Sequence, residues 1–220
     1  MTPHVRLIAK TVPVISGLDS TESLVAYCAK VSSSAQDDLS QSGKLLNYLR
    51  DHSHWSPLEM AHVVFEIVTS RAIARQLLRH RSFSFQEFSQ RYSDEIEFQP
   101  LQAARLQDKK NRQSSIEHDD ETLQVWWERE QDMAIRESET RYIEALSLGI
   151  AKECARVVLP EGLTTSRLYM AGSLRSWFHY CELRTGNGTQ LEHQEIALAI
   201  QDILVEEFPS IFISQKKGTM

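Results

Sequence analysis

The sequence predicts an α+β fold, a helix-rich single domain with a small antiparallel sheet. Apolar residues recur at helical spacing over long stretches, most clearly in residues 125–148 and 189–208. Residues 62–69 instead alternate as a strand, with Val63, Phe65 and Ile67 on one face. We find no internal repeat and no alternating strand–helix–strand pattern, which argues against a parallel sheet. The 220 residues, 41% of them hydrophobic, are ample for a core.

The remaining elements follow from caps, breaks and periodicity. In the first half of the chain we expect a strand over 5–14, a helix capped by Ser20 or Thr21, a short helix over 43–50, the strand 62–69 and a helix over 70–80. An amphipathic helix over 125–148, broken by Gly149, is followed by a helix ending at 158, a short strand over 166–171 and a helix from Ser173 to Arg184. A turn at 186–188 leads to the last helix, which a capping box at 189–192 opens and Phe208 and Pro209 stop. Residues 82–99 are polar and extended or loop-like. Residues 102–124 are the least hydrophobic stretch, and we interpret them as an exposed insertion or a loop beside a helix. We expect a loose tail at 215–220 and one domain over 1–220.

Charge and cysteine content exclude several classes of protein. The net charge of −6 argues against a dedicated nucleic-acid binder, so a phosphate ligand would need a local cluster of cations. Cys28, Cys154 and Cys181 have no metal or redox spacing, and we expect each to be a small buried hydrophobe. No stretch reaches the ~18 apolar residues of a membrane span, and no signal peptide is evident. These features predict a cytoplasmic protein without membrane or nucleic-acid partners.

The segment 71–92 is the most informative one. Arg71, Arg75 and Arg79 recur every four residues and would share one helix face. Like charges at this spacing repel by roughly 0.2–0.5 kcal/mol per pair, so we expect an anion or carboxylates against that face. Arg79, His80 and Arg81 would fall at the helix C-terminus, where the macrodipole favours cations. Surface arginines with no ligand are the alternative interpretation of this pattern.

Polar and aromatic residues then interleave between residues 82 and 92. Phe83, Phe85 and Phe88 alternate with side chains that form hydrogen bonds, a pattern poor for a helix and poor for a solvated loop. It suits a pocket wall, where aromatics anchor the backbone and polar groups face a ligand. Arginines beside serine hydroxyls suit a phosphate, which takes several donors at once.

At this point the sequence resembles the flavin-dependent thymidylate synthases. Arg79-His80-Arg81, seven residues and then Ser89 match the family's RHR-x7-S signature, and Glu87, Arg91 and Tyr92 stand where it expects them. Three more blocks agree in order and spacing. They are HWSPLE at 54–59, ARVVLP at 155–160, and GSLR at 172–175 with His179-Tyr180 and Leu183-Arg184. The resemblance spans roughly residues 50–205.

The resemblance implies conversion of dUMP to dTMP, with methylenetetrahydrofolate as carbon donor and NADPH-reduced FAD as hydride source. It implies a set of FAD contacts at Ser56, Arg79, His80, Arg81, Glu87, Ser173, Arg175 and His179. It implies a set of dUMP contacts at Gln76, Arg79, Glu87, Phe88, Ser89, Gln90, Arg91, Arg156 and Arg184.

Three residues are the catalytic candidates. Arg184 matches the arginine that favours ionisation of the uracil N3, and His54 would lie near the contact of folate with flavin. Ser89 is either a substrate-orienting hydroxyl, which we prefer, or a nucleophile that would need His80 as its base. No cysteine occurs in the motif, which excludes the cysteine-nucleophile class of thymidylate synthase. His52 and His54 lack further partners at ligand spacing, so we expect no metal.

Helix geometry adds an expectation about assembly. Arg175 and His179 lie four residues apart on one face, whereas Arg184 lies about half a turn away from Arg175. One helix would thus present ligands on two sides, which favours pockets between subunits and is consistent with the homotetramer typical of the family.

Some positions depart from the family pattern. Ser173 and Gln86 stand where asparagine is common, Met60 and Gly188 stand where histidine is common, and one extra residue lies between Pro160 and Gly172. The changes at 173 and 188 bear on flavin contacts and could adapt the site to another pyrimidine. Three alternatives therefore stay open: a flavoenzyme acting on a related pyrimidine nucleotide, a nucleotide-binding regulator without catalysis, and a helical interaction protein without a pocket.

Overall fold

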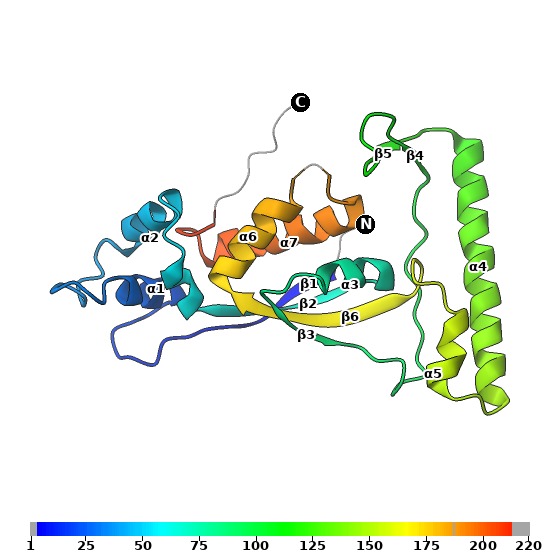
Figure 1. Ribbon diagram of the computed structural model, residues 1–220, viewed down its shortest axis with the longest axis horizontal. Coiled ribbons are helices and arrows are strands. Elements are labelled where there is room, and N and C mark those ends of the chain that lie inside the picture. Colours follow the sequence, from blue (N-terminus) through cyan, green and yellow to red (C-terminus); the bar gives the residue numbers. More distant parts are fainter. Residues whose placement is uncertain (1–3, 187, 213–220) are drawn as a thin grey trace.

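A four-stranded antiparallel sheet forms the centre of the protein, and helices pack on one of its faces (Figure 1). The computed structural model describes residues 4–186 and 188–212. The strand order is β1 (His4–Lys10), β2 (His62–Ser70), β6 (Thr165–Ser173) and β3 (Ser84–Glu87), and each neighbouring pair is antiparallel. The predicted α+β class with a small antiparallel sheet is confirmed.

The helices that cover the sheet are α3 (Arg71–Leu77), α6 (Leu174–Arg184) and α7 (Leu191–Glu207). α3 follows β2 directly and α6 follows β6 directly, and a serine side chain caps each helix at the junction. Ser70 accepts a hydrogen bond from the Ile73 backbone N–H, and Ser173 accepts one from the Ser176 N–H. These caps fix where each strand turns into its helix.

The two ends of the sheet carry separate groups of elements (Figure 1). At one end lie α1 (Thr21–Ala29), α2 (Ser42–Asp51) and the 3₁₀ turn η1 (Ser56–Met60). At the other end lie the long α4 (Glu121–Ser147), α5 (Lys152–Ala155), the 3₁₀ turn η2 (Arg156–Val158) and a hairpin of β4 (Arg105–Gln107) and β5 (Ser115–Glu117). The predicted cap at Ser20 is confirmed as a capping box with Ser23, and Gly149 ends the α4 segment with φ of 81°.

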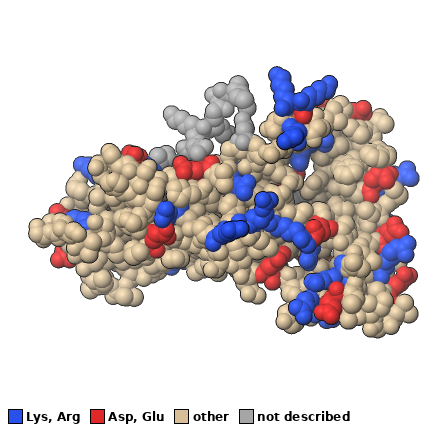
Figure 2. Space-filling view, in the orientation of Figure 1, with Lys and Arg blue, Asp and Glu red and all other residues tan. Residues whose placement is uncertain are grey.

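Helix α4 stands at the edge of the molecule, with charges of both signs along it (Figure 2). Four of these charges form two pairs one helical turn apart, Arg136 with Asp132 at 2.9 Å and Arg141 with Glu137 at 2.8 Å. The helix also leaves large apolar side chains exposed, at Val125, Trp126, Trp127, Met133 and Ile143. A single chain therefore does not cover the apolar surface of this helix.

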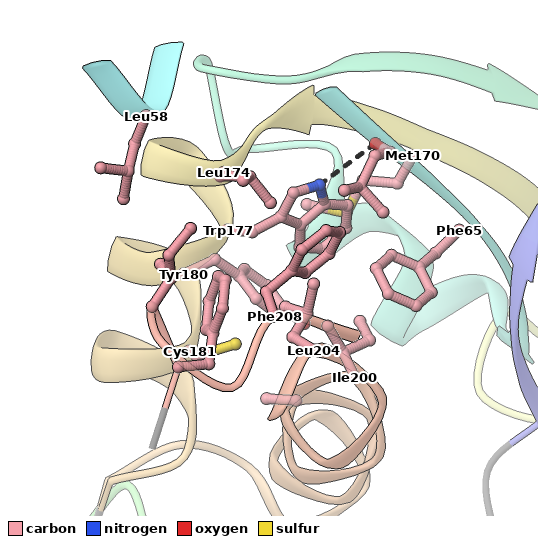
Figure 3. Close-up of a cluster of buried hydrophobic side chains, with 14 of the residues drawn as sticks. Leu58, Phe65, Met170, Leu174, Trp177, Tyr180, Cys181, Ile200, Leu204 and Phe208 are labelled. Atoms are coloured by element: carbon pink, nitrogen blue, oxygen red, sulfur yellow. Dashed lines mark hydrogen bonds between the residues drawn. The ribbon is translucent and has the colours of Figure 1, made fainter. Parts of the chain in front are cut away.

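The core lies between the sheet and the helices α6 and α7 (Figure 3). Val63, Phe65 and Ile67 are fully buried on the face of β2 predicted from their alternation. Trp177 of α6 packs edge-on against Phe65, with ring centroids 4.9 Å apart, and its Nε1–H donates to the Val63 carbonyl at 3.2 Å. Burial of one such side chain stabilises the fold by about 1.5–3 kcal/mol. This packing fixes α6, which carries several candidate residues.

The structure differs from the prediction at the end of α3. The predicted helix over 70–80 is wrong in its last turn, because α3 ends at Leu77 and Leu78 is its C-cap. Arg79, His80 and Arg81 therefore lie in a loop, and Arg79 does not share a helix face with Arg71 and Arg75. The expected carboxylate partner is present for Arg75, which pairs with Glu161, whereas Arg71 donates to the Gln90 amide oxygen at 2.6 Å.

Residues 102–124 are a second difference, since they form the β4–β5 hairpin and the first residues of α4. Two glutamines of α4 hold this polar stretch in place. Gln124 bonds both backbone groups of Ala104 at 2.7 and 2.9 Å, and Gln131 bonds both backbone groups of Gln102 at 2.9 and 2.8 Å. Side-chain amides replace apolar contacts here, so hydropathy gave no sign of order. The interpretation as an exposed insertion or a loop beside a helix is confirmed in its exposure and in its place before α4, but it missed the short hairpin.

Smaller differences concern boundaries and caps. β1 ends at Lys10 and β6 extends from Thr165 to Ser173. The predicted capping box at 189–192 is wrong: Gln190 is the N-cap of α7 and makes no side-chain capping bond. Cys154 is exposed and Cys28 half-buried, so only Cys181 is the buried thiol expected of all three. Asn187 and the predicted tail at 215–220 lie outside the described residues.

Within the described ranges, no helix combines the length and the apolar character needed to cross a bilayer.

Candidate functional site

The loop after α3 lies on α6, and this contact brings two candidate residues together. Arg184 Nε donates to His80 Nε2 at 3.0 Å, and Ser176 Oγ donates to the Ser82 carbonyl at 3.2 Å. Phe83 anchors the loop because the edge of its ring packs directly against Gly172. A Cβ added at Gly172 would lie only 2.5 Å from Phe83 Cδ1. Glycine at 172 is therefore required by the close approach of the ring, and it gives this loop its place on α6.

The electrostatics of this contact favour an anion. Burial, then the positive charges of Arg184 and Arg79, lower the pKa of His80 to about 4, so its imidazole is neutral at ordinary pH. Arg79 and Arg81 are exposed. In the part of the chain that the structure describes, no carboxylate pairs with Arg79, Arg81 or Arg184. We call Gln76, Arg79, His80, Arg81 and Arg184 the loop group.

Gln76 belongs to the same place because the start of α7 holds its side chain. Its Nε2 donates to Gln190 Oε1 at 2.7 Å, and its Oε1 lies 3.1 Å from His193 Nδ1. His193 is fully buried, and burial, then the charge of Arg184, lower its pKa to about 3. Sequence reasoning missed His193 and Gln190. A signal existed, because His193 precedes the buried Ile196 and Ala197 by three and four residues and so lies on the core face.

A second set of candidates surrounds the N-terminal end of α6. Arg175 Nη1 donates to Glu59 Oε1 at 2.9 Å, and the hydroxyl of Ser173, then Arg175, lower the pKa of Glu59. The ring of His179 stands edge-on to Trp55 at 4.9 Å. We call Ser56, Glu59, Ser173, Arg175 and His179 the η1 group. Glu59 was not predicted, although it closes the quoted HWSPLE block.

His54 lies immediately before η1 and is exposed. Its ring lies 5.9 Å from that of Tyr48 and 6.3 Å from that of His52, centroid to centroid. His52 Nδ1 itself lies 2.9 Å from the Tyr48 carbonyl. Among the residues with assigned positions, no three His, Cys, Asp or Glu side chains gather as they would around a metal ion. The exposed ring of His54 thus lies beside Tyr48 and His52, and its catalytic role stays a prediction.

The third set lies at the opposite end of β6. Glu87 accepts a hydrogen bond from Ser166 at 2.6 Å. Gln90 is 2% exposed, and its amide oxygen is taken by Arg71. The backbone N–H of Phe88 donates to the Arg167 carbonyl at 2.8 Å. We call Glu87, Phe88, Ser89, Gln90, Arg91 and Arg156 the strand-end group.

Two arginines of the strand-end group meet one acidic residue. Arg91 pairs with Glu153 at 3.4 Å, and Arg156 Nε donates to the Glu153 carbonyl at 3.3 Å. Ser89 Oγ accepts from the Arg91 backbone N–H at 3.3 Å. Within residues 4–186 and 188–212, no side-chain base makes a hydrogen bond to Ser89, while His80 is bonded to Arg184. This geometry favours the orienting hydroxyl over the nucleophile.

The three groups are spread along the sheet. Ser166, which holds Glu87, and Ser173, which begins the η1 group, are seven residues apart on β6, which corresponds to about 23 Å of strand. The structure thus unites His80 with Arg184, and Arg91 with Arg156, but it does not bring all candidates around one point of a single chain.

Comparisons with known proteins find relatives over nearly the whole chain. A family model described as thymidylate synthase complementing protein matches residues 13–210. A probable flavin-dependent thymidylate synthase of Paramecium bursaria Chlorella virus 1 is 49% identical over 207 residues, 94% of this chain and 95% of that protein. The flavin-dependent thymidylate synthase of a Synechocystis species is 50% identical over 210 residues, 94% of this chain and 96% of that protein.

Solved structures match as well. Two crystal structures of the UMP/dUMP methylase PolB from Streptomyces cacaoi, bound with 5-Br UMP and 5-Br dUMP, superpose with TM-scores of 0.79 and 0.80. Each is 25% identical in sequence and covers 95% of this chain, which in turn covers 91% and 92% of theirs. The fold is thus that of a known class of pyrimidine nucleotide methylase. Within that class, the chain belongs to the thymidylate synthase complementing protein family, whose relatives named above are flavin-dependent thymidylate synthases.

Proposed function

We propose that this protein is an FAD-dependent methyltransferase that converts dUMP to dTMP. Methylenetetrahydrofolate supplies the carbon, and NADPH supplies the reducing equivalents. The observation that carries the proposal is identity of 49–50% to flavin-dependent thymidylate synthases over nearly the whole length of both chains. The loop group adds a physical reason, because it is a cluster of guanidinium groups without neutralising carboxylates in the described chain.

The residues present fit FAD. Arg79 and Arg81 are exposed donors without an ionic partner among described residues, which suits the pyrophosphate of a dinucleotide. Arg175, Ser56, Ser173 and His179 add polar groups at the other end of α6, and His80 and Glu87 complete the set that would hold the cofactor. When bound, the flavin supplies the hydride that reduces the transferred carbon.

Arg184 is the residue that polarises the uracil ring in this proposal. Its Nε is held by His80, which leaves the two Nη groups to face the substrate. Because His80 Nε2 accepts this bond, the neutral imidazole carries its proton on Nδ1. The guanidinium keeps its full charge beside a neutral histidine and stabilises negative charge as the uracil N3 loses its proton.

The strand-end group would grip the phosphate and sugar of dUMP. Arg91 and Glu153 have side chains that are 59% and 57% exposed. Such a pair contributes about 0–1 kcal/mol, so a phosphate can replace the carboxylate at little cost. Ser89 and Arg156 add a hydroxyl and a second guanidinium beside it. Gln76 and Arg79 contribute from the loop group.

We further propose a homotetramer with active sites between subunits. Two observations support this assembly. Among the described residues, no hydrogen bond or ion pair joins the loop group to the strand-end group, although both are expected to contact the same small nucleotide. Helix α4 also exposes large apolar side chains, a feature typical of protein contact surfaces. A closed symmetric assembly would bury α4 and let one subunit complete the site of another.

A second candidate substrate is UMP, because the PolB structures are described as those of a UMP/dUMP methylase. The purified protein should release tritium from [5-³H]dUMP and form dTMP only with FAD, NADPH and methylenetetrahydrofolate together. Parallel reactions with UMP and dCMP define the base and sugar that it accepts. NADPH oxidation without tritium release, or failure to take up FAD, would contradict the proposed reaction.

A further inference from the structure

Four side chains form a hydrogen-bonded chain from the first turn of α7 to α3. Gln190 Nε2 donates to Glu192 Oε2 at 2.9 Å, and Gln76 Nε2 donates to Gln190 Oε1 at 2.7 Å. Gln76 Oε1 then meets His193 Nδ1 at 3.1 Å. Glu192 is anchored in turn by Arg105 Nη2 at 2.6 Å. Gln190 and His193 thus contact the side chain of Gln76 directly, and Glu192 acts on it through Gln190.

The Glu192 carboxylate, at one end of this hydrogen-bonded chain, determines which atom donates in every hydrogen bond. Burial raises the pKa of Glu192, but hydrogen bonds from its own backbone, Arg105 and Gln190 outweigh this effect and lower it, so the group is ionised and can only accept. Gln190 must therefore donate with its amide nitrogen and accept with its oxygen. Gln76 must do the same in turn. His193 then carries its proton on Nδ1 and donates to the Gln76 oxygen.

Gln76 has two N–H groups, and the chain uses one of them. Its oxygen is occupied by His193 and one N–H by Gln190, so a single N–H remains for a ligand. An amide rotated by 180° would present its oxygen instead, which repels the oxygens of a nucleotide. The polarity of the chain thus decides whether Gln76 is a donor or an acceptor toward the substrate.

We propose that Glu192, Gln190 and His193 are positioning residues that lock the amide of Gln76, so that its free N–H meets an acceptor oxygen of the nucleotide. This inference rests on the proposed function, in which Gln76 contacts dUMP. His193 suits the role because it is neutral: it is buried beside His80, with ring centroids 6.2 Å apart, and near the cation of Arg184. Its Nε2 is buried and ends the hydrogen-bonded chain without a partner among the described residues, and the ring centroids of His193 and Tyr180 lie 5.9 Å apart.

The test uses four variants of the FAD-loaded enzyme and the dissociation constant of dUMP by calorimetry. His193→Leu removes the donor to Gln76, whereas His193→Asn keeps an N–H near the place of Nδ1. Glu192→Gln keeps the size of the side chain but lets it donate, so the direction of the chain is no longer imposed. Arg105→Met is the matched control, because it removes the ion pair of Glu192 and leaves the carboxylate in place.

We expect His193→Leu and Glu192→Gln to weaken dUMP binding by roughly tenfold, the value of one lost hydrogen bond. The kcat at saturating dUMP should stay within about threefold, because the reacting atoms are untouched. His193→Asn should recover most of the affinity, and Arg105→Met should bind within about twofold of the unmodified protein.

Unchanged dUMP affinity in both His193→Leu and Glu192→Gln would overturn the inference while leaving the proposed function intact. Equal losses in Glu192→Gln and Arg105→Met would also overturn it, since the ion pair and not the direction of the chain would then matter. An unmodified protein that binds no dUMP would instead overturn the proposed function, and this inference with it.

Discussion

Replacing Gly172 by alanine tests whether the Phe83 anchor positions the loop group. The new Cβ would lie 2.5 Å from Phe83 Cδ1 and 2.6 Å from Cε1. Ordinary carbon contacts are about 3.5–4.0 Å, so the ring must retreat by about 1 Å. Phe83 cannot move freely, because its ring packs edge-on to Trp177 with centroids 4.6 Å apart. The loop must therefore shift with it.

The size of the effect follows from this crowding. Overpacking of this kind costs about 1–3 kcal/mol, which lowers the Tm of a chain of this length by about 2–4 °C per kcal/mol. The Phe83 backbone N–H donates to the His80 carbonyl at 3.3 Å, so the displacement reaches the bond between His80 and Arg184. We expect dUMP binding to weaken by about tenfold, because a shift of about 1 Å breaks a hydrogen bond.

The assay combines thermal melts with calorimetry of dUMP binding for Gly172→Ala, Phe83→Leu and the double variant. The smaller leucine makes room for the Cβ, so the double variant should bind dUMP more tightly than Gly172→Ala alone. Gly162→Ala is the matched control, since its Cβ would have no neighbour within 4 Å. A Gly172→Ala protein with unchanged dUMP affinity, or one that Phe83→Leu does not rescue, would refute this reasoning.

Three further predictions concern acid stability, catalysis and assembly. The pKa of His193 falls from 6.5 to about 3 on folding, so below pH 6.5 the unfolded state binds a proton that the folded state does not. The free energy of unfolding therefore falls as the pH drops from 6.5 toward 3. Lowering the pH from 7.5 to 5.5 should lower the free energy of unfolding by about 1.4 kcal/mol through His193. Urea titrations at fixed protein concentration should show that His193→Asn lacks this loss. Arg184→Lys should lower kcat by about 10²–10³, because a lysine cannot bond His80 and face the uracil ring together; steady-state rates with normal FAD content check this, and a wild-type kcat contradicts it. Ile143→Glu on α4 should give a smaller assembly in sedimentation velocity and lower activity, whereas an unchanged sedimentation coefficient would exclude this face from the interface.

Elements with a buried face could be predicted from the sequence, because burial of one face requires apolar residues at a regular spacing along the chain. The alternation of β2 placed Val63, Phe65 and Ile67 on the core side, and the structure confirms all three as fully buried. The Ser173 cap of α6 was likewise readable, since a serine before an apolar helical stretch supplies a missing acceptor.

Features that depend on tertiary contacts could not be predicted. Nothing local stops α3 at Leu77, because arginine and leucine are good helix formers. The helix ends there because the following loop docks on α6 through His80 and Phe83. The β4–β5 hairpin was missed for a related reason, since glutamine side chains from α4 hold it and no apolar alternation marks it.

The candidate site divides in the same way. Motif resemblance supplied residue identities, and the pairing of His80 with Arg184 gives them a common place. The order of the motifs in the sequence does not give their separation in the folded sheet. It therefore did not reveal that Glu87 and Ser173 lie near opposite ends of β6. The sequence does not mark His193 as a site residue, because a lone histidine on an apolar helix face is usually a packed core residue. Its hydrogen bond to Gln76 becomes visible only in three dimensions.

We propose that one active site takes Arg184 from one subunit and Arg91 from another. Subunit complementation tests it most directly, with tritium release from [5-³H]dUMP as the readout. Arg184→Ala and Arg91→Ala proteins should each be inactive alone. Co-expressed in equal amounts, they should regain about a quarter of the wild-type activity, because random mixing gives that share of sites two intact contributors. Mixed assemblies that stay inactive would contradict the account.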